Sequence, residues 1–299
     1  MKTALFFLAC LFVASSTKSY AALYLTLDEL ERSTTFASDQ RFASVGAITW
    51  EHPSNPFQIA GSGVLIAPNW VLTAAHVVDA FNRNTTGPVN FGLGLNASDP
   101  FAIARVAESI RHPTWSGILS RGDIALLRLE TPIDMQYASL YRGREPSSSW
   151  TPTAYMAGYG QYGILNGDLQ RDQFLRAGAN VVYRGPSSTN DTWTVDLAGL
   201  RPNDRIDMEW KGTPGDSGGG WFIDVDGEWQ LGAITSSSFL PYNGPYTTSA
   251  TSVSRFATWI GSNVTAIPEP NAFFLCCAGV MFFATRCRRW SEQSVAPGG

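Results

Sequence analysis

The sequence predicts an all-β protein assembled from short strands. Between residues 42 and 262, β-branched and apolar runs alternate with turn sequences, and a helical period is almost absent. Hydrophobic residues make up 44% of the chain and aromatic residues 12%, which is enough for a sizeable core. Many short strands are typical of β-barrels and β-sandwiches, and the periodicity alone leaves both open.

Two series of strands are expected, separated by a polar stretch at 142–149. Turn chemistry at 67–69 and 87–88 divides the first series. The strands are predicted at 45–50, 63–66, 70–73, 102–106 and 124–129, and then at 153–158, 179–183, 220–223 and 229–234. One helix is expected after them, with Gly261 as its stop and an apolar face of Val253, Phe256, Ala257 and Ile260.

The composition argues against nucleic acid as a partner and against metal or disulfide chemistry in the folded part. The net charge is −4, and no cluster of Lys or Arg lies in the expected globular region. Phosphate neutralisation needs such a basic face. No disulfide or cysteine-ligated metal is expected there, because all four cysteines lie near the ends of the chain: Cys10, Cys276, Cys277 and Cys287. No cofactor or metal is expected, because the sequence has no evident nucleotide-binding loop or metal-ligand cluster.

Three motifs supply the groups of a nucleophilic hydrolase, in the order His, Asp, Ser. His76 ends the run Thr-Ala-Ala-His, Asp123 precedes an apolar run, and Ser217 lies within Gly-Asp-Ser-Gly-Gly-Gly at 215–220. A serine hydroxyl attacks at neutral pH only when a base takes its proton, and a buried carboxylate holds that base in one tautomer. The sequence therefore predicts acyl-transfer hydrolysis by His76, Asp123 and Ser217.

The surroundings of each residue support its predicted role. Glycines on both sides of Ser217 allow a sharp turn, and the N–H groups of Gly215 and Ser217 are expected to form the oxyanion hole. Asp123 would be costly to bury beside apolar residues unless it bonded the protonated base. The two other histidines, His52 and His112, each precede a proline and are expected to be structural or exposed.

At these motifs the chain resembles the chymotrypsin/trypsin-like serine proteases, with further similarity at 61–66, 112–115, 157–160 and 253–256. The resemblance covers about residues 42–262. It implies two six-stranded antiparallel barrels, at about 42–145 and 150–252, followed by a short C-terminal helix. It also implies an active site in the cleft between the barrels and an endopeptidase that acts on proteins or peptides through a covalent acyl-enzyme.

The same resemblance assigns three residues to the substrate pocket: Lys211, Thr235 and Ser237. Lys211 stands six residues before Ser217, where trypsin-like members carry an aspartate, so cleavage after Lys or Arg is not expected. If the ammonium of Lys211 points into the pocket, acidic side chains would be accepted. The alternative, in which this ammonium reaches solvent, stays open.

Residues 22–41 have two interpretations, a pro-segment or an N-terminal extension of the fold. In the family, the aspartate at the position of Asp216 binds a new N-terminal amine released by proteolysis. No Ile-Val-Gly-Gly-like start occurs in this sequence, and cleavage after Arg41 would expose Phe42, a poor match. Whether a zymogen step exists is left open by the sequence.

Both ends of the chain carry expected targeting signals. Residues 1–21 combine a basic start, a short apolar run and small residues near the end, which predicts a secretory signal peptide; an N-terminal anchor is the alternative. Residues 263–299 resemble a bacterial PEP-CTERM sorting signal, with Pro-Glu-Pro at 268–270, a short hydrophobic segment at 272–285, and then Arg286, Arg288 and Arg289.

The PEP-CTERM resemblance implies transient anchoring in the inner membrane and recognition by an exosortase-type enzyme, which would leave the protein secreted or on the cell surface. An ordinary single-pass transmembrane helix is the alternative, although the segment is short against the roughly 20 residues that a spanning helix needs. The sequence thus predicts an exported serine endopeptidase. The alternatives are a catalytically inactive protease-like protein that binds partners at the cell surface, or a structural matrix protein.

Overall fold

The computed structural model describes residues 22–52, 55–85, 87–119, 121–165, 167–188, 190–197, 205–239 and 247–264. The predicted signal peptide and the hydrophobic segment of the predicted sorting tail lie outside these residues. In the described part of the chain, no helix has the length and apolar character needed to cross a membrane. Contacts divide the chain into a unit at 1–255 and a second at 256–299, and all the described strands lie in the first unit.

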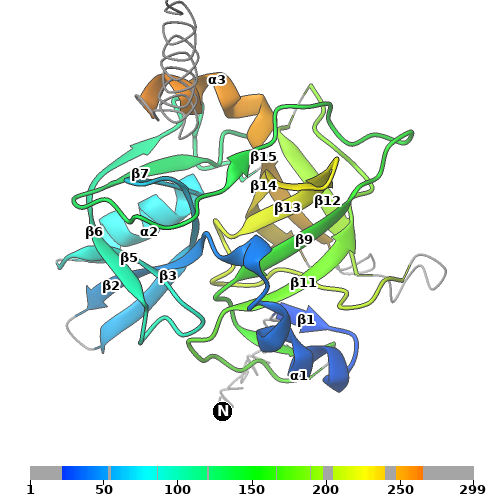
Figure 1. Ribbon diagram of the computed structural model, residues 1–299, viewed down its shortest axis with the longest axis horizontal. Coiled ribbons are helices and arrows are strands. Elements are labelled where there is room, and N and C mark those ends of the chain that lie inside the picture. Colours follow the sequence, from blue (N-terminus) through cyan, green and yellow to red (C-terminus); the bar gives the residue numbers. More distant parts are fainter. Residues whose placement is uncertain are drawn as a thin grey trace, which may run out of the picture. The chain divides into compact units, whose positions relative to one another are not determined.

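Antiparallel strands close a barrel in the first half of the chain, in the order β2–β3–β4–β7–β6–β5 (Figure 1). These strands are β2 at Val45–His52, β3 at Asn55–Ala67, β4 at Trp70–Thr73, β5 at Val89–Leu93, β6 at Ala102–Arg111 and β7 at Ala125–Leu129. Their inward side chains form one core, which includes Ile48, Leu65, Val71, Phe91 and Leu127. Successive side chains of a strand point to opposite faces, so every second residue of each strand points into this core.

A second, seven-stranded sheet follows, with antiparallel order β11–β9–β13–β14–β15–β12 and a short β8 that pairs in parallel with β14. The strands are β8 at Ser139–Leu140, β9 at Thr153–Gly158, β11 at Arg176–Val181, β12 at Thr192–Asp196, β13 at Gly220–Val225, β14 at Glu228–Phe239 and β15 at Thr247–Ser252. The core of this sheet includes Trp193, Trp210 and Trp221.

The two edges of the second sheet, β11 and β12, meet through a side chain. Asn180 Nδ2 donates to the carbonyl of Asp196 at 2.8 Å. Beyond the end of β11, the N–H of Thr194 donates to the carbonyl of Arg184 at 2.8 Å. The sheet therefore curls into a half-barrel, whereas the first sheet is closed by backbone pairing throughout.

This arrangement confirms the predicted fold class, a chymotrypsin-like all-β fold with a C-terminal helix. The first barrel has the six strands expected, whereas the second is a curled half-barrel within a seven-stranded sheet. That helix, α3 at Val253–Asn263, runs through Gly261, the expected stop. Gly261 does not have the positive φ with which a glycine ends a helix. Helix α2 at Ala75–Asn84 was not expected, and it begins one residue before His76.

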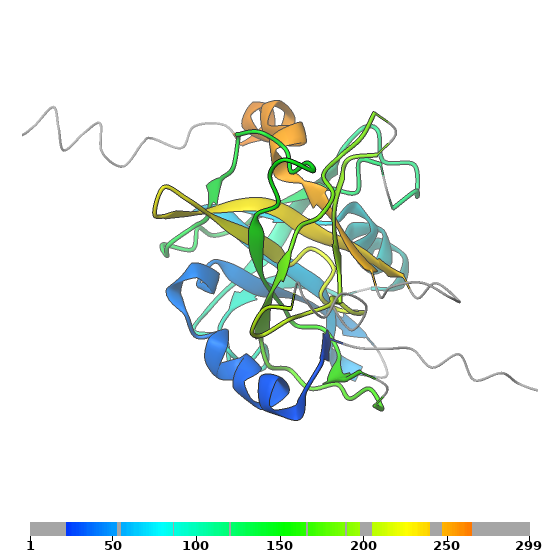
Figure 2. The same ribbon diagram turned by 90° about the vertical axis from the view of Figure 1, so that its right-hand side faces the viewer.

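Residues 22–42 pack onto the second sheet. Strand β1 at Ala22–Tyr24 pairs in parallel with β10 at Tyr162–Ile164. Helix α1 at Leu27–Phe36 begins with a capping box and contacts β11 (Figure 1 and Figure 2). A short 3-10 helix at Gln40–Phe42 then leads into β2.

Candidate active site

His76 and Asp123 lie together at one end of the first barrel. Asp123 stands two residues before β7, and its side chain is 0% exposed. Its Oδ1 accepts a hydrogen bond from the backbone N–H of His76 at 3.0 Å, and its Oδ2 lies 2.8 Å from Nδ1 of the His76 ring. The carboxylate thus fixes both the backbone and the ring, so that Nε2 is the nitrogen left for proton exchange.

Strands of the second sheet complete the surroundings of Asp123. The hydroxyl of Ser236, in β14, donates to Asp123 Oδ2 at 2.5 Å. The hydroxyl of Thr251, in β15, donates to the backbone carbonyl of Asp123 at 3.0 Å. Sequence reasoning missed Ser236, although it lies between Thr235 and Ser237, which were assigned to the substrate pocket. The only signal was a polar run inside a strand.

The segment that carries Ser217 is held against the first barrel. The carbonyl of Ser217 accepts from the N–H of Ser62 at 2.8 Å, and the hydroxyl of Ser62 donates to the carbonyl of Gly215 at 2.9 Å. A Cβ on Gly218 would lie 3.1 Å from the backbone N of Ala74, which precedes His76 by two residues. These contacts bring the loop of Ser217 to the part of the barrel from which His76 projects.

The backbone of this loop exposes two N–H groups. Gly215 and Gly218 have φ values of +106° and +83°, which favour glycine. The N–H groups of Asp216, Gly218 and Gly219 bond to the carbonyls of Thr213, Thr235 and Asp216 at 2.8–2.9 Å. Among the described residues, the N–H groups of Gly215 and Ser217 have no acceptor. These two N–H groups, two residues apart in one loop, are able to bind the oxygen of a substrate carbonyl.

Of the three residues assigned to the substrate pocket, two are in the interior. Lys211 is 1% exposed, so the alternative in which its ammonium reaches solvent does not hold. Burial lowers the pKa of Lys211 to about 8, although the negative charge of Asp216 opposes this effect. Thr235 is 2% exposed and accepts a hydrogen bond from the indole of Trp221 at 2.9 Å. Ser237 is partly exposed.

No group of three or more His, Cys, Asp or Glu side chains is arranged to bind a metal ion in the described ranges.

A two-sheet β-fold with a buried carboxylate bonded to a histidine and a glycine-flanked serine loop defines the class of chymotrypsin-like proteins. Residues 35–260 match the trypsin family, and the chain belongs to that family. This membership implies peptide substrates.

Several relatives show the extent of the similarity. The chain is 27% identical over 220 residues to Proproteinase E of Bos taurus, covering 68% of this chain and 82% of that protein. It is 29% identical over 212 residues to Chymotrypsin-like elastase family member 3B of Macaca mulatta, covering 68% and 81%. A shorter match, 34% identical over 109 residues, joins it to Submandibular glandular kallikrein-9 of Rattus norvegicus, covering 30% and 40%.

Proposed function

We propose that this protein is a serine endopeptidase in which His76, Asp123 and Ser217 form the catalytic triad. The observation that best supports the proposal is the pair of hydrogen bonds that Asp123 accepts from His76, which orients the ring of a general base. The unpaired N–H groups of Gly215 and Ser217, in the loop that contains the serine, supply a matching oxyanion hole.

The proposed reaction proceeds in two halves. His76 takes the proton of the Ser217 hydroxyl while the oxygen attacks the peptide carbonyl, and the N–H groups of Gly215 and Ser217 stabilise the oxyanion that forms. The imidazolium then gives its proton to the leaving amine, and an acyl-enzyme remains. Water, deprotonated by His76, cleaves the ester and restores Ser217. Asp123 stays ionised and stabilises the imidazolium in both halves.

The test is labelling of the secreted protein with a fluorophosphonate probe, together with hydrolysis of a denatured protein substrate. We expect the wild type to be labelled at Ser217 and to cleave the substrate. Ser217→Ala should melt at the same temperature, remain unlabelled, and lose activity by about 10⁶-fold, as expected when the nucleophile is removed. A wild type that is folded but neither labelled nor active would instead support the inactive binding protein.

The proposed enzyme does not prefer to cleave after Lys or Arg. Lys211 carries positive charge near the loop of Ser217, and a basic substrate side chain brought towards it would be repelled. A peptide library with all residues varied before the cleaved bond gives the measurement. Strong preference for arginine at that position would contradict the assignment of Lys211.

We also propose that the protein is exported, with residues 1–21 removed and the sorting tail at 263–299 recognised by an exosortase-type enzyme. The support is the order of Pro-Glu-Pro, hydrophobic segment and arginines in the sequence. Intact-mass analysis of the mature protein should find residues 286–289 absent. Their retention in a membrane fraction would support the single-pass anchor.

A further inference from the structure

The carboxylate next to the proposed nucleophile is enclosed by internal donors. Asp216 is 1% exposed. Its Oδ1 accepts from the N–H of Gly160 at 2.8 Å, and its Oδ2 accepts from the N–H and hydroxyl of Thr213 at 2.9 and 2.8 Å. Burial raises the pKa of Asp216 to about 6, and these hydrogen bonds oppose that rise.

Backbone packs against this carboxylate so closely that no further group fits on that side. A methyl group at Gly160 would lie 2.4 Å from Cγ of Asp216, and one at Gly158 would lie 2.5 Å from Oδ1. Both distances are far inside van der Waals contact. The cage of Asp216 is therefore complete without any group brought in from elsewhere.

Strand β1 joins the two segments that build this cage. On one side Leu23 pairs with Gly163 in β10, three residues after Gly160. On the other side the N–H of Leu23 donates to the carbonyl of Lys211 at 3.1 Å, and the N–H of Lys211 donates back at 3.2 Å, two residues before Thr213. Leu23 thus lies between β10, which follows the donor Gly160, and the segment of Lys211, which precedes the donor Thr213.

The side chains around β1 make it part of the core. Tyr24 is 0% exposed, and its hydroxyl donates to the carbonyl of Ala177 at 2.9 Å. Arg32 of helix α1 forms an ion pair with Asp207, in which Nη2 lies 2.7 Å from Oδ1. Removing β1 would uncover this core and leave the backbone groups of Lys211 without their partners.

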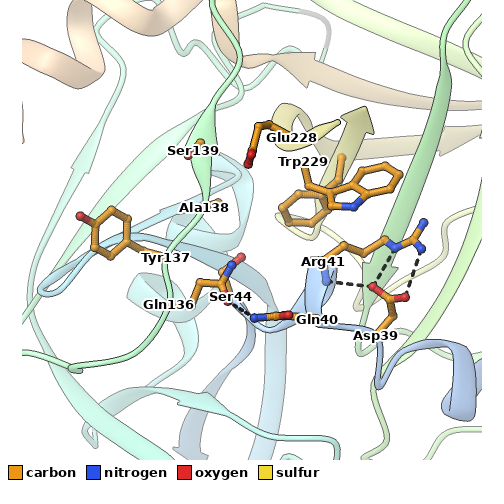
Figure 3. A pocket seen from close by; sticks show the side chains of 11 residues that line it. Asp39, Gln40, Arg41, Ser44, Gln136, Tyr137, Ala138, Ser139, Glu228 and Trp229 are labelled. Carbon is orange, nitrogen blue, oxygen red and sulfur yellow. Dashed lines mark hydrogen bonds and ion pairs between the residues drawn. The ribbon is translucent and has the colours of Figure 1, made fainter. Parts of the chain in front are cut away.

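The bond after Arg41, the site considered for activation, is also covered. The Arg41 guanidinium stacks over Trp229 at 4.2 Å and over Tyr155 at 4.6 Å, and it pairs with Asp39. Figure 3 shows Arg41 beside Trp229, at a surface pocket of about 440 Å³. The next residue, Phe42, is 0% exposed. A protease needs an extended, accessible chain, and this helical turn does not offer one.

We propose that residues 22–42 stay attached in the active enzyme and brace the loop of Ser217, so that activity requires no cleavage within them. This inference rests on the proposed function. Leu23 acts as a positioning residue, because it touches neither substrate nor the reacting groups and works through Lys211 and β10. On this proposal the segment is an N-terminal extension of the fold and not a pro-segment.

The first test identifies the N-terminus of active molecules. The full chain is expressed, exported and labelled with a fluorophosphonate probe, and the labelled protein is sequenced from its N-terminus. A labelled species that begins at or before Ala22 supports the inference. One that begins at Phe42 or later overturns it. If the wild type is labelled no more than Ser217→Ala, the proposed function fails, and the inference that rests on it fails too.

The second test separates positioning from mere stability. Leu23→Pro removes the N–H that bonds Lys211, whereas Leu23→Val keeps it, and Asp28→Asn changes an exposed residue of the same segment. With active sites counted by the probe, we expect kcat per labelled site to fall about tenfold in Leu23→Pro, equivalent to one lost hydrogen bond, with KM unchanged. Leu23→Val and Asp28→Asn should keep the wild-type kcat.

If Leu23→Pro lowers only the labelled fraction and leaves kcat per labelled site unchanged, the brace role is overturned. If Leu23→Pro does not fold, deletion of the hydroxyl in Tyr24→Phe gives a milder loosening of the same strand. An unchanged kcat per labelled site in that variant overturns the inference equally.

Discussion

The closed barrel and the seven-stranded sheet of this protein hold polar groups in different ways. The first is closed by backbone pairing all the way round, and it presents His76 and Asp123 at one end. The second is a curled sheet whose edges meet through Asn180, and it encloses Lys211 and Asp216. The closed barrel thus supports the contact between Asp123 and His76. The second sheet instead buries two ionisable groups, Lys211 and Asp216, whose charged forms burial disfavours.

The same difference bears on the position of residues 22–42, which pack onto the second sheet. A buried lysine and a buried aspartate carry a desolvation cost, and hydrogen bonds and apolar cover from neighbouring segments reduce it. Strand β1 and helix α1 add apolar cover and hydrogen bonds there.

The largest expected effect lies in the first barrel. Asp123→Asn keeps the shape of the side chain but removes the charge that fixes the His76 tautomer, so kcat should fall by about 10⁴-fold. Because Asp123 is 0% exposed and bonded to His76, Ser236 and Thr251, the melting temperature should be measured alongside. A kcat within tenfold of the wild type, at unchanged stability, would show that His76 does not depend on this carboxylate.

The next largest effect is expected at Asn180, which joins the two edges of the second sheet. Asn180 is 4% exposed, and its amide also donates to the carbonyl of Trp210 at 3.1 Å. Asn180→Ala removes the donor to the carbonyls of Asp196 and Trp210 and should lower the free energy of unfolding by about 2–4 kcal/mol. Asn84→Ala, which removes an exposed side chain on α2, is the control and should change it by less than about 0.5 kcal/mol. Equal effects in urea melts would mean that Asn180 does not hold the edges.

Much of this architecture could be predicted from local sequence. Strands β4 and β9 have the bounds that were predicted, because their apolar residues are compact and flanked by turns. Strand β11 starts at Arg176, before the predicted 179, because Arg-Ala-Gly-Ala has weak strand propensity and is extended only by its pairing with β9. The capping box at Thr26 and Glu29 was readable, yet helix α1 was not predicted.

The contacts that the sequence did not predict all join distant residues. Ser236 binds Asp123 across 113 positions, so no local pattern identifies its partner. Lys211 is covered by Leu23, which lies in a segment that the sequence left open between pro-segment and extension. A lysine is rarely buried, and its usual exposure made the solvent-facing alternative a reasonable expectation.

Ser236 offers a smaller effect where the two sheets meet. Its hydroxyl adds a third polar contact to Asp123, and a hydrogen bond to a charged group contributes about 1.5–3 kcal/mol. Ser236→Ala should therefore reduce kcat about 10- to 100-fold, with KM changed little. Ser98→Ala, which removes an exposed serine hydroxyl outside the proposed site, is the control and should keep the wild-type kcat. If Ser98→Ala lowers kcat as much as Ser236→Ala, the contact to Asp123 is not the relevant one.

The smallest effect is the pH dependence that Lys211 gives to the second sheet. Its folded pKa of about 8 lies below the usual 10.5, because burial disfavours the ammonium. Between these values the unfolded chain binds more protons than the folded one, so the free energy of unfolding rises with pH. From pH 7.5 to 8.5 this single group contributes about 0.7 kcal/mol. Lys211→Met, similar in length and without the charge, should remove that rise in urea melts at the two pH values. A rise that is the same in Lys211→Met and the wild type would assign it to another group and remove the argument that the second sheet needs cover for this lysine.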